Sequence, residues 1–155
     1  MRGKQAPKRD LRPDDKFGNT SVTRFINYIM KDGKRTIAEK IVYECFDIIK
    51  ETTKKEGIEI FDGAMKNISP QIEVRSKRIG GGNYQVPVEV RSGRRESLAF
   101  RWLLVADRAK KGKDMAERLA FELIEAFNNR GDAIKKKEDV YKMAQANRAF
   151  AHFVR

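Results

Sequence analysis

The sequence has few of the residues on which secreted proteins and membrane proteins depend. Its 155 residues include one cysteine, Cys45, and the longest wholly apolar run is Trp102–Ala106. A single cysteine forms no internal disulfide, which is typical of a reducing compartment. The apolar run is far shorter than the ~20 residues of a membrane-spanning helix. The N-terminal segment is basic but has no apolar stretch behind it, unlike a secretory signal. We therefore expect a soluble cytosolic protein with no membrane partner.

The sequence also has little of what catalysis needs. Its only histidine is His152, so a histidine-based triad or a zinc site would lack its usual partners. Cys45 lies in an apolar stretch and is interpreted as a core thiol. The glycines 80–82 are followed by neither Lys-Ser/Thr nor a helix, which favours a turn over a phosphate-binding loop. Asp14 and Asp15 are neighbours in an extended segment and rarely converge on one proton. We expect no catalytic residue, no metal and no cofactor.

Positive charge is what the sequence has in excess. Its 34 Lys and Arg residues outnumber 22 Asp and Glu residues, for a net charge of +12, while 40% of the residues are hydrophobic. That apolar fraction is enough for a core, and the length suits one domain over residues 1–155. The charge is uneven: +3 over 1–16, +4 over 71–95 and +3 over 132–155, with +2 over the other 90 residues. We therefore expect a polyanionic partner, with nucleic acid first.

Apolar periodicity predicts a mainly α fold of six helices after an extended, flexible basic arm at residues 1–19. The first helix is capped by Thr20 or Ser21 and ends at Asp32-Gly33. The second closes at 54–57, and the third covers about 58–68. The fourth is capped by Ser92, the fifth begins at Asp114, and the sixth continues to about Phe153. Core candidates of the fourth helix are Leu98, Ala99, Trp102, Leu103, Val105 and Ala106; those of the sixth are Val140, Met143, Ala144, Ala151 and Val154.

Residues 72–91 predict a β-hairpin between the third and fourth helices. Apolar residues alternate with polar ones over 72–79 and 84–90, on either side of the glycine trio. A three-residue loop, Gly80–Gly82, would pair Ile72 with Val90 and Arg78 with Tyr84. The distal half of such a ribbon is basic and poor in apolar residues, and an isolated two-stranded ribbon is marginal in water. We therefore expect it to project and to insert against a polyanion.

The residues themselves leave the type of nucleic acid open. Arg94, Arg101 and Arg108 recur every seven residues and form a stripe on the fourth helix, which either contacts nucleic acid or pairs with local acids. Tyr84 and Phe17 can stack on unpaired bases or pack internally. A basic β-arm on a helical body also occurs in architectural DNA-binding proteins. RNA binding, DNA binding and, as a remote third, enzymatic turnover are thus the candidate functions.

Several long motifs resemble one family over essentially the whole chain. They are Pro-Asp-Asp-Lys-Phe-Gly at 13–18 and the segments 25–35, 73–81, 84–91, 95–102, 133–143 and 146–152. The sequence resembles the bacterial-type small ribosomal subunit protein seven family. The resemblance implies a non-enzymatic primary binder of small-subunit ribosomal RNA that nucleates assembly of the head. It also implies that the hairpin tip and the last helix approach the exit-site tRNA and mRNA beside a neighbouring ribosomal protein, in a bacterial or organellar ribosome.

The resemblance also implies which residues bind. For ribosomal RNA they are Arg2, Lys4, Lys8, Arg9, Lys34, Arg35, Arg75, Lys77, Arg78, Arg94, Arg95, Arg101, Arg108, Lys110, Lys111 and Lys113. The residues facing tRNA or mRNA are Ile79, Gly80, Gly81, Gly82, Asn83, Tyr84, Arg148, His152 and Phe153.

Overall fold

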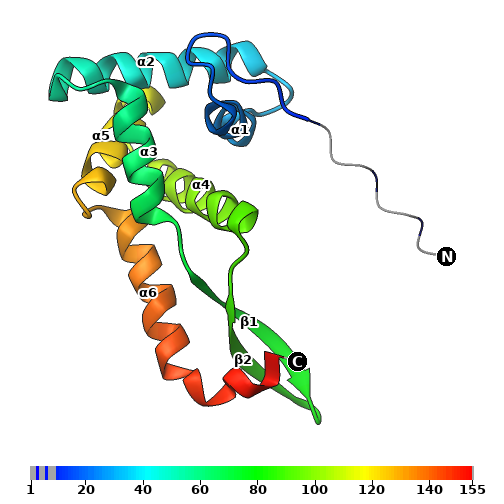
Figure 1. Ribbon diagram of the computed structural model, residues 1–155. Coiled ribbons are helices and arrows are strands. Elements are labelled where there is room, and N and C mark those ends of the chain that lie inside the picture. Colours follow the sequence, from blue (N-terminus) through cyan, green and yellow to red (C-terminus); the bar gives the residue numbers. More distant parts are fainter. Residues whose placement is uncertain (1–2, 4–5, 7–9, 155) are drawn as a thin grey trace. The chain divides into compact units, whose positions relative to one another are not determined.

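The fold is mainly helical, with one antiparallel two-stranded hairpin between the third and fourth helices, as predicted (Figure 1). The computed structural model describes Gly3, Ala6 and residues 10–154. The chain divides after Lys40 into two compact units, so the single domain over residues 1–155 stays a prediction. In the described part of the chain no helix combines the length and apolar character that crossing a bilayer requires.

The first unit contains α1 (Thr20–Ile29) and the start of α2 (Arg35–Thr53). The N-cap of α1 is Asn19, whose Oδ1 accepts a hydrogen bond from the backbone N–H of Ser21 at 2.8 Å. The predicted caps, Thr20 and Ser21, are wrong because both already lie inside the helix. The apolar face of α1 is buried as predicted, at Val22, Phe25, Ile26 and Ile29.

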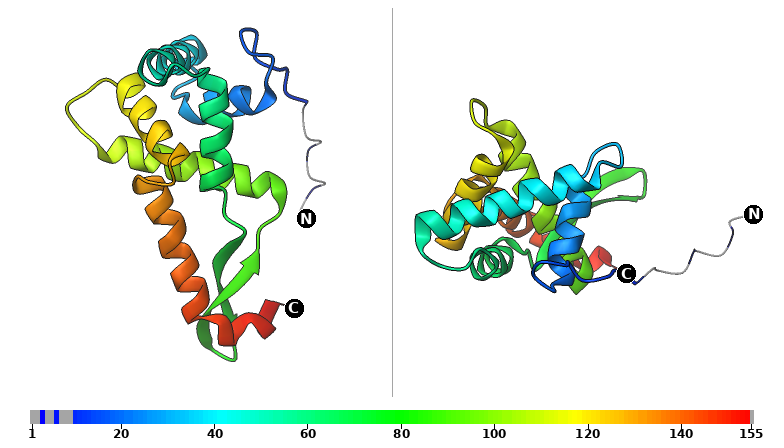
Figure 2. Two further views of the ribbon diagram at one scale, coloured as in Figure 1. Left: turned by 60° about the vertical axis from the view of Figure 1, so that its left-hand side comes forward. Right: turned by 90° about the horizontal axis from the view of Figure 1, so that it is seen from above.

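The second unit holds the rest of the helices. They are α3 (Gly57–Ile68), α4 (Ser92–Ala109), α5 (Met115–Phe127), α6 (Asp132–Ala146) and the 3₁₀ helix η1 (Arg148–Val154). Within this unit α5 packs against both α3 and α4, and α6 packs against α4 and the hairpin (Figures 1 and 2). The ring of Phe61 lies at the centre, 5.6 Å from that of Phe46 and 6.4 Å from that of Phe100. These contacts join α2, α3 and α4 through one aromatic cluster.

The buried face of α4 differs from the prediction at several positions: Leu98 and Trp102 are only half-buried, and three further residues are buried. Ala99, Leu103 and Ala106 are buried as expected, together with Phe100, Leu104 and Asp107. Val105 is 65% exposed, so its assignment to the core is wrong. The buried residues form two rows at helical spacing, 99/103/106 and 100/104/107, and both rows face inward. Position 105 is therefore left on the opposite side of the helix.

The hairpin pairs in a register one residue away from the predicted one. Strand β1 (Ile72–Ile79) runs antiparallel to β2 (Gly82–Glu89), with Ile72 opposite Glu89 and Ile79 opposite Gly82. The loop has two residues, Gly80 and Gly81, with φ of 56° and 91°. Positive φ at both positions is the two-residue turn whose twist matches that of the strands. The predicted three-residue loop and the pairing of Ile72 with Val90 are therefore wrong.

The last predicted helix is two elements. Helix α6 ends at Ala146, and η1 follows after Asn147, whose side-chain N–H donates to the Met143 carbonyl at 2.8 Å. The change of direction brings η1 against β2 (Figure 1). Of the predicted core positions, Ala144 is buried, Val140 is half-buried, Met143 and Ala151 are exposed, and the side chain of Val154 lies outside the described part.

Candidate RNA interface

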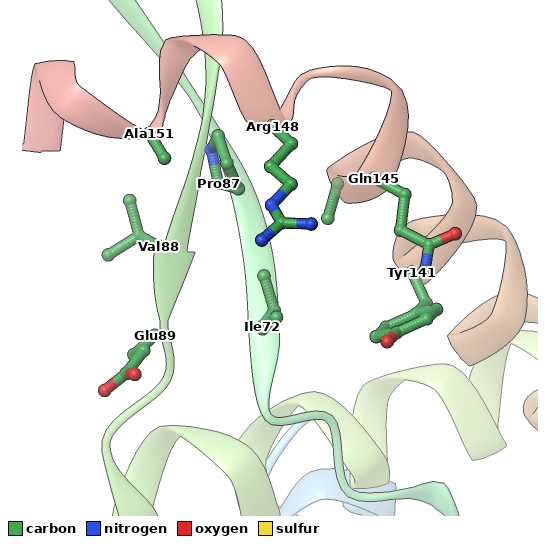
Figure 3. A pocket seen from close by; sticks show the side chains of 9 residues that line it. Ile72, Pro87, Val88, Glu89, Tyr141, Gln145, Arg148 and Ala151 are labelled. Atoms are coloured by element: carbon green, nitrogen blue, oxygen red, sulfur yellow. The ribbon is translucent and has the colours of Figure 1, made fainter.

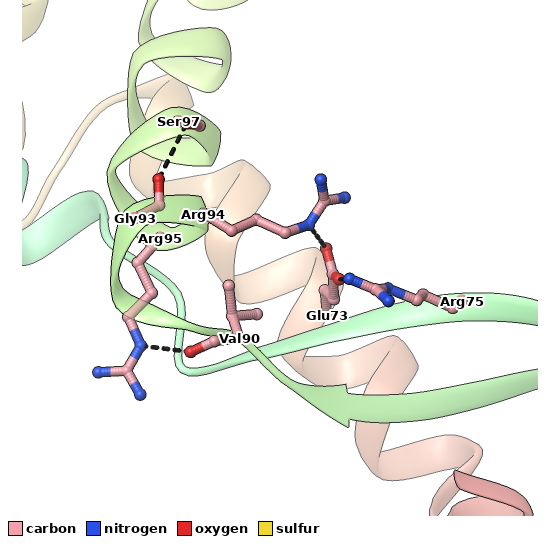
Figure 4. A network of polar contacts seen from close by, with 7 residues as sticks. All are labelled: Glu73, Arg75, Val90, Gly93, Arg94, Arg95 and Ser97. Atoms are coloured by element: carbon pink, nitrogen blue, oxygen red, sulfur yellow. Dashed lines mark hydrogen bonds and ion pairs between the residues drawn. The ribbon is translucent and has the colours of Figure 1, made fainter. Parts of the chain in front are cut away.

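A buried carboxylate at the base of the hairpin holds two of the predicted RNA-binding arginines. Glu73 is 6% exposed. Its Oε1 accepts from Nε of Arg75 at 2.5 Å, and its Oε2 accepts from Nε of Arg94 at 2.7 Å (Figure 4). The side chains of Arg75 and Arg94 stay 55% and 44% exposed. Glu73 therefore orients both guanidinium groups while part of each remains open to solvent.

Arg95 is held separately, at the start of α4. Its Nε donates to the carbonyl of Val90 at 2.8 Å, and its side chain leaves the helix in a different direction from that of Arg94 (Figure 4). Arg95 is nevertheless exposed. Three arginines at the junction of the hairpin and α4 are thus held by partners in the chain, and their side chains point in more than one direction.

The predicted stripe along α4 is accessible over its whole length. Arg94, Arg101 and Arg108 are all exposed. The buried face of α4 lies on the side of Leu103 and Ala106, away from these arginines. The stripe therefore continues the positive surface from the hairpin base along the helix.

The two sets of residues predicted to face tRNA or mRNA meet in the second unit. The ring of Tyr84 in β2 lies 5.2 Å from that of Phe150 and 5.6 Å from that of Phe153, both in η1. Nζ of Lys77, which is opposite Tyr84 in the hairpin, donates to the carbonyl of Phe153 at 2.8 Å. The distal hairpin therefore has an apolar partner within the chain, which the sequence pattern did not reveal.

The surroundings of this cluster remain open. Gly80, Gly81 and Asn83 are exposed. His152 is exposed as well; its ring lies 4.0 Å from that of Phe153, and its Nδ1 donates to the Ala149 carbonyl at 2.8 Å. That hydrogen bond uses Nδ1, so Nε2 is the imidazole nitrogen left for another partner.

A groove of about 450 Å³ lies between the hairpin, α6 and η1 (Figure 3). Arg148, a predicted tRNA-facing residue, points into it. The other lining residues are mostly apolar: Ile72, Pro87, Val88, Glu89, Tyr141, Ala144, Gln145 and Ala151. Arg148 is exposed, so its guanidinium can be reached from the groove.

Lys110, in the connector between α4 and α5, turns inward. Its Nζ forms an ion pair with Glu122, which is 0% exposed, and lies 4.0 Å from Oδ2 of Asp132. Oε1 of Glu122 accepts from the backbone N–H of Ala133 at 2.9 Å and so caps the start of α6. Lys110 is thus held by a buried ion pair within the fold, whereas the nearby Lys111 and Lys113 are exposed.

Glu122 itself was missed by the sequence reasoning. The available signal was one acidic residue between the core positions Leu119, Ala120 and Leu123 of α5. A charged residue on an apolar helix face implies a buried partner, because an unpaired buried charge is very costly.

A second buried acid, Asp107, lies near Cys45. Burial raises the pKa of Asp107, and Nε of Arg118 lies 3.7 Å from its Oδ1 without a hydrogen bond. Burial also raises the pKa of the Cys45 thiol, and the charge of Asp107 adds to that rise. Cys45 is therefore a protonated core thiol and not a nucleophile. Among the described residues, no three His, Cys, Asp or Glu side chains gather as metal ligands would.

In the first unit, Asp14 has a structural role. It is 3% exposed, and its Oδ2 accepts from the backbone N–H groups of Lys16 at 3.1 Å and Phe17 at 3.2 Å. Nε of Arg35 pairs with Oε1 of Glu39 at 2.7 Å, and Lys34 is exposed. The predicted arm residues Arg2, Lys4, Lys8 and Arg9 lie outside the described residues.

Comparison with known proteins supplies the family. A family model described as "Ribosomal protein S7p/S5e" matches residues 1–148. The chain belongs to this family. Proteins called "Small ribosomal subunit protein uS7" are similar over nearly the full length of both chains: 57% identity for that of Thermotoga maritima (99% of each chain) and 53% for that of Dechloromonas aromatica (98% of this chain, 97% of the relative). The corresponding protein of Desulforamulus reducens is 54% identical, over 95% of this chain and 94% of the relative.

This S7p/S5e chain is accordingly a structural protein of the small ribosomal subunit and not an enzyme. The candidate cations of its second unit fall into three groups. Arg78, Arg101, Arg108, Lys111 and Lys113 are exposed; Arg75, Arg94 and Arg95 are exposed but oriented by partners in the chain; Lys77 and Lys110 are engaged by Phe153 and Glu122.

Proposed function

We propose that this S7p/S5e chain is a primary binder of small-subunit ribosomal RNA that nucleates assembly of the head, in the cytoplasm or in an organelle. The observation that carries the proposal is the row of exposed arginines that begins at the hairpin base and follows α4. Glu73 fixes the two guanidinium groups at its start, and Arg101 and Arg108 continue it.

The chemistry of this surface suits RNA phosphates. A guanidinium offers five donors in a rigid plane, so Nε of Arg75 or Arg94 can bind Glu73 while other N–H groups bind a phosphate oxygen. A side chain that is already oriented loses less conformational freedom on binding. Phosphate contacts position the protein on RNA, and counterion release makes the affinity fall with salt.

The hairpin tip and η1 are proposed to lie near the exit-site tRNA and mRNA, beside a neighbouring ribosomal protein. The Tyr84–Phe150–Phe153 cluster fixes the position of η1 on the hairpin. The exposed His152 therefore lies near the tip of the hairpin, where Gly80, Gly81 and Asn83 are also exposed. Backbone N–H groups and small side chains permit the close approach of a sugar-phosphate backbone.

RNA binding is tested with Arg78, Arg101 and Arg108 changed together to alanine. All three side chains are exposed, so helicity should stay unchanged. Each lost phosphate contact should reduce the salt slope of the affinity by about 0.7 to 0.9, so the triple variant should flatten it by roughly 2 to 3. Arg75 and Lys77 are left intact because their intrachain contacts would mix folding with binding.

The matched control changes Lys31, Lys66 and Arg130 to alanine, since these exposed cations come from nearly neutral segments. It removes the same charge and should leave the slope nearly unchanged. Equal slopes for the arginine variant and the wild type would contradict the proposed surface. Displacement of structured RNA by duplex DNA at equal salt would favour the DNA-binding alternative.

The exit-site proposal is tested by hydroxyl-radical probing from an iron chelate attached to Asn83→Cys. Cys45 is buried, so the new cysteine is the reactive thiol. In reconstituted small subunits we expect cleavage of exit-site tRNA or mRNA. Cleavage of ribosomal RNA without either would contradict the placement of the tip. A second thiol at Lys66→Cys serves as the control for probing from a surface outside the proposed interface.

A further inference from the structure

The surface between the α4–α5 connector and α5 contains an exposed aromatic ring beside lysines. Phe121 is 57% exposed, and Nζ of Lys110 lies 4.7 Å from the centre of its ring. The ring borders a recess of about 410 Å³, within the roughly 300–1,000 Å³ of small-molecule sites. The recess is lined by Lys110, Lys111, Lys113, Glu117, Arg118 and Phe121.

Folding does not account for the position of Phe121. Helix α5 buries Ala116, Leu119, Ala120 and Leu123 on its inner face, and Phe121 lies on the other side. Within the described part of the chain it is the one phenylalanine whose side chain is mainly exposed. Aromatic residues are enriched at the centres of interaction surfaces, and Phe121 is an exposed aromatic residue that borders a recess.

The charges around the ring divide into internal and external ones. The ammonium group of Lys110 is used by Glu122, and an N–H of Arg118 donates to the Lys110 carbonyl, which orders the connector. Lys113 is 71% exposed and has only a long contact, 3.9 Å, with Glu117. Lys111 is exposed and makes no ion pair with any described residue. Two accessible ammonium groups therefore accompany one accessible aromatic face.

We propose that Phe121, Lys111 and Lys113 form a stacking subsite for one unpaired nucleotide of the bound RNA, an inference that rests on the proposed RNA-binding function. The base stacks on the Phe121 ring, and the two lysines attract the flanking phosphates. Stacking on an aromatic side chain tolerates every base because each has a π face, so the subsite selects unpaired over paired nucleotides rather than a sequence.

The test compares Phe121→Ala with Phe121→Tyr in binding to small-subunit ribosomal RNA. Loss of one base–aromatic stack corresponds to about a 5- to 150-fold loss of affinity, which we expect for alanine but not for tyrosine. Because Phe121 is uncharged, its removal should leave the salt slope unchanged. The joint change of Lys111 and Lys113 to alanine should instead flatten the slope. Met143→Ala, at an exposed apolar position of α6 outside the proposed surface, is the matched control and should bind normally.

A direct readout uses Phe121→Trp. Stacking of a base should quench its fluorescence when the RNA binds, beyond the change that Trp102 alone gives in the wild type. Normal RNA affinity of Phe121→Ala, with the arginine triple variant still impaired, would overturn the stacking subsite alone. Absence of RNA binding by the wild type would overturn the proposed function itself. Normal RNA binding by Phe121→Ala with poor incorporation into subunits would assign the ring to a protein contact and overturn the subsite.

Discussion

Replacing Glu122 by alanine removes two interactions of one buried carboxylate. Its Oε2 pairs with Lys110, and its Oε1 accepts the backbone N–H of Ala133 at the start of α6. The side chain is 0% exposed, so its loss also leaves a cavity. Gly131, just before α6, lies close against this carboxylate, because a Cβ built there would be 2.9 Å from Oε1.

The expected destabilisation follows from these contacts. Loss of a helix cap costs about 1 kcal/mol, and removal of one partner of a buried ion pair costs about 3–5 kcal/mol when the other charge stays buried. Lys110 is 27% exposed and can turn toward water, which reduces the second cost. We expect a total of about 3 kcal/mol, or about 6–12 °C in melting temperature for a protein of this size. Glu122→Gln keeps an acceptor for Ala133 and should cost only about 1–2 kcal/mol.

Urea denaturation followed by far-UV circular dichroism measures these differences. Glu117→Ala is the control, because Glu117 lies on the same helix, is 51% exposed and has only a 3.9 Å contact with Lys113. It should change the unfolding free energy by less than about 0.5 kcal/mol. A Glu122→Ala variant as stable as the control would refute the role assigned to the buried carboxylate.

Three further perturbations test other parts of the second unit. Burial raises the pKa of Asp107 above its ordinary 3.8, so the contribution of this carboxyl to stability falls as pH rises from that value through the folded-state pKa. In pH-dependent denaturation, the unfolding free energy of Asp107→Asn should therefore rise relative to that of the wild type over this range. A difference that stays constant with pH would contradict this. Cys45, protonated and buried, should react with a thiol reagent at least about 100-fold faster in concentrated guanidinium than in the native protein, and fast native labelling would count against it. Tyr84→Ala removes the ring packed on Phe150 and Phe153, so amide protons of η1 should exchange faster while those of α5 do not change; Tyr84→Phe should preserve protection, and equal exchange in all three proteins would show that the ring does not hold η1.

Much of the helical architecture could be predicted because the local patterns agree with the packing. The buried face of α1 follows from apolar periodicity. Helix α4 begins at Ser92, but its N-cap is Arg91, so the predicted cap at Ser92 is wrong. Val105 was wrongly assigned to the core because it lies in sequence between the buried residues Leu104 and Ala106. Only the packing of α4 decides which side of the helix is covered.

The hairpin and the end of α6 could not be predicted to the residue. The glycine trio permits both a two- and a three-residue loop, and only the tertiary contacts select Gly80-Gly81. That choice puts Glu73 beside Val88 and lets it reach Arg94. The apolar spacing of residues 148–154 fits a continued helix, whereas packing against β2 favours the 3₁₀ turn.

The sequence therefore predicted which cations lie on the candidate interface better than it predicted which of them are free to bind RNA. The exposed arginines of α4 are where the helical spacing puts them. That Lys110 and Lys77 are used within the chain could not be read from the sequence, because their partners, Glu122 and the carbonyl of Phe153, are brought close only by the fold.

The contact between the hairpin and η1 also sets an order of events during synthesis of the chain. Lys77 and Phe153 are 76 residues apart, and all of α4, α5 and α6 lies between them. The hairpin can form as soon as β2 has been made, but its aromatic cover exists only after these three helices. Contacts between such distant segments form late because closing the intervening loop is entropically costly. The nascent hairpin therefore passes through a stage in which the face of Tyr84 is bare, and this is the stage at which binding by a chaperone or by RNA would compete with native packing.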